Sequence, residues 1–125
     1  DFFVQAMCAL KNNGLVALVS DRDFFGLGIE LPFFGKTLQV PTGPAAFSLR
    51  SGAPIVPVFL VREQDGSYRF ICEEPIISPQ GLSREEATRV IMEQCVQVME
   101  RYIQAYPTQW YLFQPFWKPV TGVIL

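Results

Sequence analysis

The stretch LVALVSDRDFFGLGIELPFFG, from Leu15 to Gly35, contains the features that decide the fold class. It begins with five consecutive apolar residues, a pattern typical of a strand that is buried on both faces of a sheet. Asp21, Arg22 and Asp23 follow, so we expect them at the carboxyl-terminal edge of that sheet, where α/β proteins bind ligands. Glycines and phenylalanine pairs then alternate, which indicates a loop with one or two short edge strands.

Helices are predicted on both sides of this stretch. Apolar residues at helical spacing over residues 2–10 are followed by a stop signal at Gly14. Residues 42–52 predict a short helix, because Pro44 suits a first turn and Gly52 suits a helix end. We therefore place the loop between two helices.

The second half of the chain predicts a hairpin and a long helix. Two apolar strands, at 53–62 and 67–75, flank the turn signal Asp65-Gly66. A capping box at residues 83–86 starts a helix that ends before Pro107. The apolar stripe of that helix consists of Ala87, Ile91, Cys95, Val98 and Tyr102. An aromatic segment, expected to be a short helix or an aromatic plug, follows with Trp110, Tyr111, Phe113, Phe116 and Trp117.

These elements predict an α/β layered domain with a mixed sheet flanked by helices. The chain has 125 residues, which suits a single domain over residues 1–125. Half of the residues are hydrophobic and 18% are charged, so we expect an apolar surface that meets a partner. No apolar run approaches the roughly 18 residues of a membrane span.

Composition excludes several classes of function. The formal net charge is −2 and the basic residues do not cluster, which argues against nucleic acid as a partner. Histidine is absent, so the chain has neither the usual general base nor a believable zinc site. Cys8, Cys72 and Cys95 are widely spaced in apolar contexts, and we expect them to be reduced core thiols. We predict no metal, no cofactor and no catalytic residue within the chain.

The polar candidates each have two interpretations. Asp21 and Asp23 are placed to act as an acid–base pair or to hold Mg²⁺, but Arg22 between them favours a salt-bridged loop with carboxylates bonded to backbone amides. Arg22 and Arg50 suit phosphate, although a solvated helix face explains Arg50 equally well. Thr42-Gly43 either presents backbone N–H groups to an anion or is an ordinary helix cap.

The order of motifs resembles the lipid A biosynthesis acyltransferases, the lauroyl and myristoyl transferases of the lysophospholipid acyltransferase superfamily. The residues that carry the resemblance are Asp21-Arg22-Asp23, Pro32 to Gly35, Thr42 to Ala45, Gly52 to Pro57, Asp65-Gly66 and the terminal YPTQWYLFQPFW. The resemblance covers nearly the whole chain. It implies a partial acyltransferase fold that transfers a fatty acyl group from acyl carrier protein to a hydroxyl of a phosphorylated glycolipid.

The resemblance also implies roles for single residues. Asp21, Arg22 and Asp23 would face the head group of the acceptor, with Arg22 and Arg50 on phosphate and Thr42-Gly43 contributing backbone contacts. Phe24, Phe25, Phe33 and Phe34, next to Gly35, would form apolar walls near acyl chains or the bilayer. Core packing is the alternative for these phenylalanines.

One departure from the family is large. Members carry a histidine followed closely by a carboxylate, and no residue of this chain matches the histidine. Because the chain begins at Asp1, we expect it to be the C-terminal portion of a catalytic domain that is inactive alone. The complete enzyme is expected at the cytoplasmic face of the bacterial inner membrane.

Three other functions fit the sequence. The acceptor is open within the enzyme class and includes phosphatidylinositol mannosides. A non-catalytic lipid-binding or membrane-docking module would explain the aromatic residues and the missing histidine. An interaction domain that completes the sheet of a partner would explain the apolar surplus.

Overall fold

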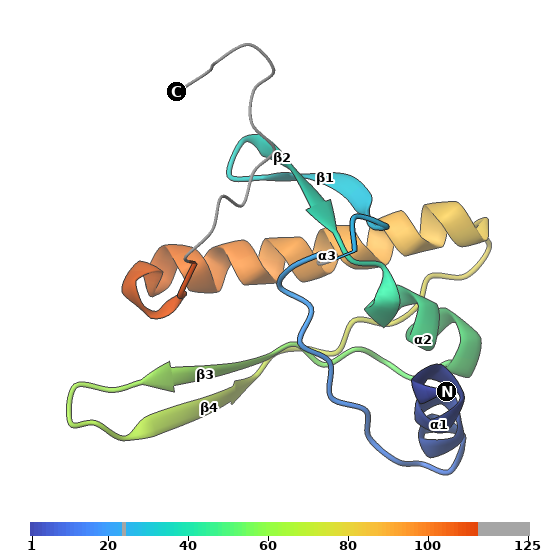
Figure 1. Cartoon of the computed structure of the whole chain (residues 1–125), viewed down its shortest axis with the longest axis horizontal. Coiled ribbons are helices and arrows are strands. Elements are labelled where there is room, and N and C mark those ends of the chain that lie inside the picture. Colours follow the sequence, from blue (N-terminus) through green and yellow to red (C-terminus); the bar gives the residue numbers. More distant parts are fainter. Residues whose placement is uncertain (24, 113–125) are drawn as a thin grey trace.

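The computed structural model describes residues 1–23 and 25–112, and Figure 1 shows their arrangement. The elements, in chain order, are α1 (Phe2–Lys11), β1 (Ile29–Phe33), β2 (Lys36–Val40), α2 (Gly43–Ser51), β3 (Val58–Arg62), β4 (Tyr68–Cys72), α3 (Arg84–Ala105) and the 3₁₀ turn η1 (Pro107–Gln109). The long helix α3 runs between two hairpins, with β1–β2 on one side and β3–β4 on the other (Figure 1). No helix in these two ranges combines the length and the apolar character that crossing a membrane requires.

Helix α3 organises the core. Its predicted capping box forms: Ser83 Oγ accepts from the Glu86 amide, and the Glu86 carboxylate accepts from the Ser83 amide. These bonds lower the pKa of Glu86. The core cluster consists of Leu31, Phe33, Leu38, Val40, Ala45, Ile76, Ile91, Met92 and Val96. The buried face therefore runs through Met92 and Val96, and Val98 is only half-buried, a small rotation from the predicted stripe.

The hairpin β1–β2 packs one face on α3. The two strands are antiparallel with Leu31 opposite Leu38, and their inward side chains are buried. Phe34 and Gly35 form the turn with φ angles of 47° and 72°. Such positive φ values at both central residues suit a tight hairpin turn. The pairing of β1 with β2 confirms the prediction of one or two short strands in this region.

Helix α2 has the predicted ends. Thr42 is the N-cap, Pro44 lies in the first turn, and Gly52 takes a left-handed conformation with φ of 75°. The buried Ser48 hydroxyl donates to the Ala53 carbonyl and lies 2.8 Å from the Ser78 hydroxyl, so its polar atom is satisfied in the interior. Helix α2 thus packs against α3 without an unpaired buried group at this position.

The hairpin β3–β4 is attached to the C-terminal half of α3. The predicted turn at Asp65-Gly66 forms, and hydrogen bonds from Ser67 lower the pKa of Asp65. Phe59 stacks on Tyr102 with ring centroids 3.8 Å apart. The Tyr102 hydroxyl donates to Glu73, which also pairs with Arg101 at 3.3 Å. This bond lowers the pKa of Glu73 and raises the pKa of Tyr102.

We expect the variant Tyr102→Phe to keep the ring stacking and to lose the pH dependence that this bond creates. The lowered pKa of Glu73 stabilises the fold above its unfolded pKa near 4.5, and this stabilisation is lost as pH falls through the folded value. The raised pKa of Tyr102 stabilises the fold below its unfolded pKa near 10, and this stabilisation is lost as pH rises through the folded value.

Urea unfolding at intervals from pH 3 to pH 11 checks this expectation. In Tyr102→Phe the loss of stability at each end of the range should be smaller than in the wild-type chain. Tyr68→Phe is the control, since the Tyr68 side chain is exposed on β4. Equal pH profiles for wild type and Tyr102→Phe would contradict the role assigned to the bond.

The strand predicted at Leu15–Val19 does not form. In the part of the chain that the structure describes, this segment belongs to neither sheet, and Leu15 and Val19 are 87% and 90% exposed. The prediction of one mixed sheet is corrected to two separate two-stranded antiparallel sheets. The physical reason is that an apolar run becomes a strand only beside a neighbour that accepts its hydrogen bonds. The α/β class itself is confirmed.

The cysteine prediction is partly wrong. All three cysteines are free, but Cys8 and Cys72 are exposed, because they lie on the outer sides of α1 and β4. Cys95 is partly buried in α3, and burial raises the pKa of its thiol to about 11. Such a thiol stays protonated at neutral pH. Phe24 and the aromatic residues Phe113, Phe116 and Trp117, for which the sequence suggested roles, lie outside the described residues.

Candidate functional site

Asp23 holds the loop before β1 by its side chain. Its carboxylate accepts from the backbone amides of Phe25, Gly26 and Gly28, at 3.2, 3.1 and 2.7 Å. This is the loop-capping arrangement that the sequence offered as one of two interpretations. At Gly28 the backbone approaches β2 so closely that an added Cβ would lie 2.0 Å from the Val40 carbonyl oxygen. Asp23 and Gly28 together fix where the loop meets the hairpin.

Asp21 and Arg22 connect this loop to the C-terminal end of the described chain. Arg22 donates from one terminal nitrogen to the Tyr111 carbonyl at 2.5 Å, and the Trp110 indole N–H lies 3.4 Å from Asp21 Oδ2. Arg22 Nε lies 3.4 Å from the same carboxylate oxygen. That nitrogen is buried and makes no hydrogen bond within the described residues, so the contact with Asp21 is an ion pair of loose geometry.

Phe33 and Phe34 point to opposite environments. Phe33 has no exposed surface and contacts Trp110 edge-on, with ring centroids 6.0 Å apart. For Phe33 the core alternative therefore holds in this structure. Phe34 keeps 41% of its surface exposed, and its backbone amide donates to Glu100 Oε1 at 2.7 Å. An apolar wall facing a ligand is compatible with Phe34 and with Phe25, which is 85% exposed.

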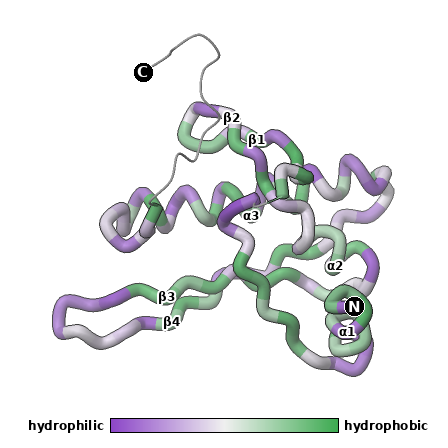
Figure 2. The backbone as a smooth tube through the Cα atoms, in the orientation of Figure 1, coloured by the Kyte–Doolittle hydropathy of each residue, from purple (hydrophilic) through white to green (hydrophobic). Residues whose placement is uncertain are grey.

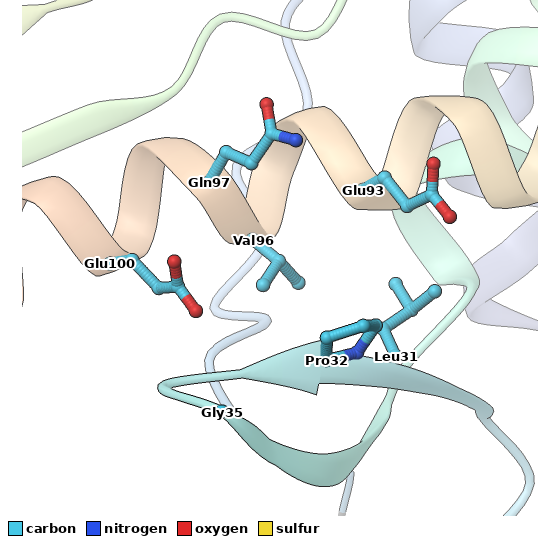
Figure 3. Close-up of a pocket in the computed structure, with 7 residues that line it drawn as sticks. All are labelled: Leu31, Pro32, Gly35, Glu93, Val96, Gln97 and Glu100. Carbon is cyan, nitrogen blue, oxygen red and sulfur yellow. The ribbon is translucent and has the colours of Figure 1, made fainter.

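A groove of about 330 Å³ lies between α3 and the β1–β2 hairpin. Its lining residues are Leu31, Pro32, Gly35, Glu93, Val96, Gln97 and Glu100, which Figure 3 shows as sticks. Glu93, Gln97 and Glu100 come from one face of α3, and Pro32 lies opposite them (Figure 3). Carboxylate and amide oxygens accept hydrogen bonds from hydroxyls, and the two carboxylates disfavour a phosphate. The groove thus suits sugar hydroxyls better than an anionic group.

The anion-binding candidates of α2 do not converge on one point. Thr42 is the N-cap residue by position, but its side chain makes no capping hydrogen bond to the backbone amides of the first turn. Arg50 lies in the last turn, with its guanidinium carbon 5.0 Å from the centroid of the Phe3 ring. The two ends of this nine-residue helix are roughly 12 Å apart. Thr42-Gly43 and Arg50 therefore do not form a single phosphate site in this arrangement.

Two contributors to the site were not assigned by the sequence reasoning. Glu100 binds the turn of the hairpin, and Trp110 joins Asp21 to Phe33. A signal for the first existed: Glu93, Gln97 and Glu100 recur at spacings of four and three residues, which predicts a polar stripe on one helix face. Trp110 was recognised only as one aromatic residue of a terminal segment.

Comparison with known proteins identifies the family. Residues 2–119 match the family described as bacterial lipid A biosynthesis acyltransferase, and the chain belongs to this family. The α/β architecture with its two small sheets is compatible with part of an acyltransferase fold.

Two curated relatives with the same printed name are similar to most of this chain. A phosphatidylinositol mannoside acyltransferase of Mycobacterium tuberculosis (strain CDC 1551 / Oshkosh) is 29% identical over 114 residues, covering 90% of this chain and 34% of the relative. The protein of the same name from Mycolicibacterium smegmatis is 28% identical over 108 residues, covering 86% of this chain and 34% of the relative. The chain thus spans about a third of the length of the curated relatives that it matches.

Proposed function

We propose that this chain forms the acceptor-facing part of an enzyme that transfers a fatty acyl group to a hydroxyl of a phosphorylated glycolipid. The observation that carries the proposal is the family match over residues 2–119. The geometry supports it, because Trp110 contacts both Asp21 and Phe33, which is next to the exposed Phe34. Gly35 of the same turn lines a groove whose oxygens suit sugar hydroxyls. Acyl carrier protein is the proposed acyl donor.

Two acceptors fit this proposal. The family description favours a lipid A precursor, and the names of the mycobacterial relatives favour a phosphatidylinositol mannoside. Both carry phosphate, sugar hydroxyls and acyl chains. An enzyme acting on either lipid would work at a membrane surface, and we propose the cytoplasmic face of the inner membrane for the complete protein.

The proposed roles of the residues follow from their positions. Asp21 is proposed to bind a head-group hydroxyl, and Phe34-Gly35 to border the acyl chains. Arg22, Asp23 and Phe33 are proposed to shape the loop that presents these groups, because Arg22 donates to the Tyr111 carbonyl, Asp23 accepts from the loop amides and Phe33 is buried. Thr42-Gly43 and Arg50 are proposed as two separate contacts for anionic groups of the acceptor.

In the mechanism that we propose, the base of the acyl-transfer step is a histidine, and this chain contains no histidine. In the proposed reaction, a histidine from the remaining part of the enzyme takes the proton of the acceptor hydroxyl, and an adjacent carboxylate orients the imidazole. The hydroxyl oxygen attacks the thioester carbonyl, the C–S bond breaks as the ester forms, and the imidazolium returns its proton to the thiolate of the carrier protein, which leaves as the thiol. The described residues bind and orient the acceptor during this step.

A chimera tests the proposal. The matching third of the M. smegmatis acyltransferase is replaced by this chain, and the purified protein is given labelled acyl carrier protein with either acceptor. Acylation of the phosphatidylinositol mannoside or of the lipid A precursor supports the proposal and selects the acceptor. A folded chimera that acylates neither lipid, with acyl-CoA as an alternative donor, would refute it.

Within this chimera, Arg50→Gln is expected to raise the KM for the acceptor about tenfold and to leave kcat unchanged. The reason is that an exposed guanidinium bound to a phosphate contributes to binding and has no part in proton transfer. Arg84→Gln is the matched control, since Arg84 is also exposed but lies at the start of α3. An unchanged KM in Arg50→Gln would remove Arg50 from the site.

A further inference from the structure

The β3–β4 hairpin has an apolar face that nothing in the described structure covers. Side chains alternate along each strand, so one side of the hairpin carries three cross-strand pairs, Val58–Cys72, Leu60–Phe70 and Arg62–Tyr68. We call these six residues the outer face. Leu60, Phe70 and Tyr68 are 62%, 68% and 63% exposed. Figure 2 shows the hydrophobic colouring of both strands and the hydrophilic turn that joins them.

The opposite face of the same hairpin is already covered. Phe59 stacks on Tyr102 of α3, and Val61 is buried. A hairpin that is apolar on both faces is typical of an interior sheet, with a second layer over the other face. A solvent-facing sheet would instead carry polar residues at positions such as Leu60 and Phe70.

Both edges of the hairpin also lack a neighbouring strand among the described residues. Each strand pairs only with the other, and the outward N–H and C=O groups of Arg62 are bonded to the Gln109 side chain. The apolar segment Leu15–Val19 has a strand-like composition and no ladder. Unpaired edges and an unpaired strand segment are what an incomplete sheet presents.

We propose that the outer face of β3–β4 is the docking surface for the remaining two thirds of the acyltransferase domain. The chain spans about a third of the length of its curated relatives, so an enzyme of their length contains enough further polypeptide to form a layer over this face. The inference rests on the family and deepens the proposed function: the part that supplies the base is held on this face.

The charges near the outer face argue for polypeptide rather than membrane as its occupant. Arg62 is the one basic residue among the six, and the turn beside it carries Glu63 and Asp65. Arg69 forms an ion pair with Glu63, with its Nε 2.6 Å from Glu63 Oε1. Surfaces that bind anionic bilayers present clusters of lysine and arginine, whereas a protein layer requires only apolar complementarity.

Cys72 is a native reporter for this proposal, because its thiol is exposed on the outer face. The rate of its reaction with N-ethylmaleimide is measured by mass spectrometry in the 125-residue chain and in the chimera described above. Gln64→Cys, in the exposed turn of the hairpin, provides the control thiol in both proteins. The expected result is at least tenfold slower labelling of Cys72 in the chimera, with the rate at position 64 unchanged.

Other results would overturn the proposal. Equal labelling of Cys72 in both proteins would show that no layer covers the face. Protection in the isolated chain that disappears on dilution would assign the face to a second copy, and protection by phosphatidylinositol–phosphatidylcholine vesicles would assign it to the membrane. If the chimera does not fold, cysteines at the positions of the intact M. smegmatis enzyme that align with Cys72 and Gln64 give the same two readings.

The labelling experiment tests the docking surface, and the acyl-transfer assay tests the proposed function, so the two proposals can be refuted separately. Protection of Cys72 without acyl transfer would leave the docking surface intact and refute the proposed acceptors. Acyl transfer without protection would support the enzyme and refute the docking surface.

Discussion

Phe33→Ala is expected to lower the free energy of unfolding by about 3–5 kcal/mol, the range typical of large aromatic truncations in cores. Phe33 has no exposed surface and joins the β1–β2 hairpin to α3. Its ring also contacts Phe34 and Trp110, with centroids 4.7 and 6.0 Å away. Removing the ring leaves a cavity between the β1–β2 hairpin, α3 and Trp110.

Urea unfolding followed by circular dichroism measures this loss. Phe34→Ala is the matched control, since Phe34 is the adjacent residue in the same turn and is 41% exposed. We expect the control to lose no more than about 1 kcal/mol, because less apolar surface returns to water. Equal losses for the two variants would contradict the assignment of Phe33 to the core.

Gly28→Ala is expected to destabilise the chain by about 3 kcal/mol or more, at or beyond the upper end of the usual cost of overpacking. An added Cβ would lie 2.0 Å from the Val40 carbonyl oxygen and 2.8 Å from Asp23 Oδ2. The first of these atoms belongs to the backbone of β2 and has no rotamer that avoids the overlap. The loop must therefore move away from the hairpin, and the Asp23 bond to the Gly28 amide is lost.

Gly43→Ala is the control for this substitution. An added Cβ at Gly43 meets no atom within 4 Å, and the residue is exposed at the start of α2. We expect its stability to stay within about 0.5 kcal/mol of wild type. Hydrogen exchange of the Phe25 and Gly26 amides should increase in Gly28→Ala alone. Unchanged exchange and stability in that variant would show that the close approach is absent in solution.

The sequence predicted the local elements well, because the signals are local. Ser83 and Glu86 satisfy each other within one helical turn, and Asp65-Gly66 closes its own hairpin. Gly52 ends α2 by its own backbone conformation. Each of these features depends on neighbours in the chain, so residue type and spacing suffice to predict it.

The strand at Leu15–Val19 was predicted wrongly because its partner is not local. Five consecutive apolar residues predict a buried strand only if neighbouring strands are available to pair with it, and the pattern gives no information on such neighbours. The exposure of Cys72 has a similar cause. The residues around Cys72 are apolar, which predicted burial, but Cys72 lies on the outer face of the β3–β4 hairpin, and no described residue covers that face.

The sequence identified Asp21, Arg22 and Asp23 as candidates, and their role in binding stays a prediction. Loop capping by Asp23, one of the two interpretations, is present in the structure. The contacts that position them were not found, because Trp110 and Tyr111 lie 89 residues away from Asp21 and Arg22. A single sequence carries no information on such pairs. Their identification requires the three-dimensional arrangement.

The bond from Arg22 to the Tyr111 carbonyl has a consequence for biosynthesis. A ribosome synthesises the loop near Asp21 long before it reaches Trp110 and Tyr111. The bond between Arg22 and Tyr111 therefore forms only after nearly all of the described chain has been translated. Until then the nascent loop lacks its distant anchor. A premature stop codon before position 110 would therefore leave the loop with its local bonds from Asp23 but without the contacts to Trp110 and Tyr111.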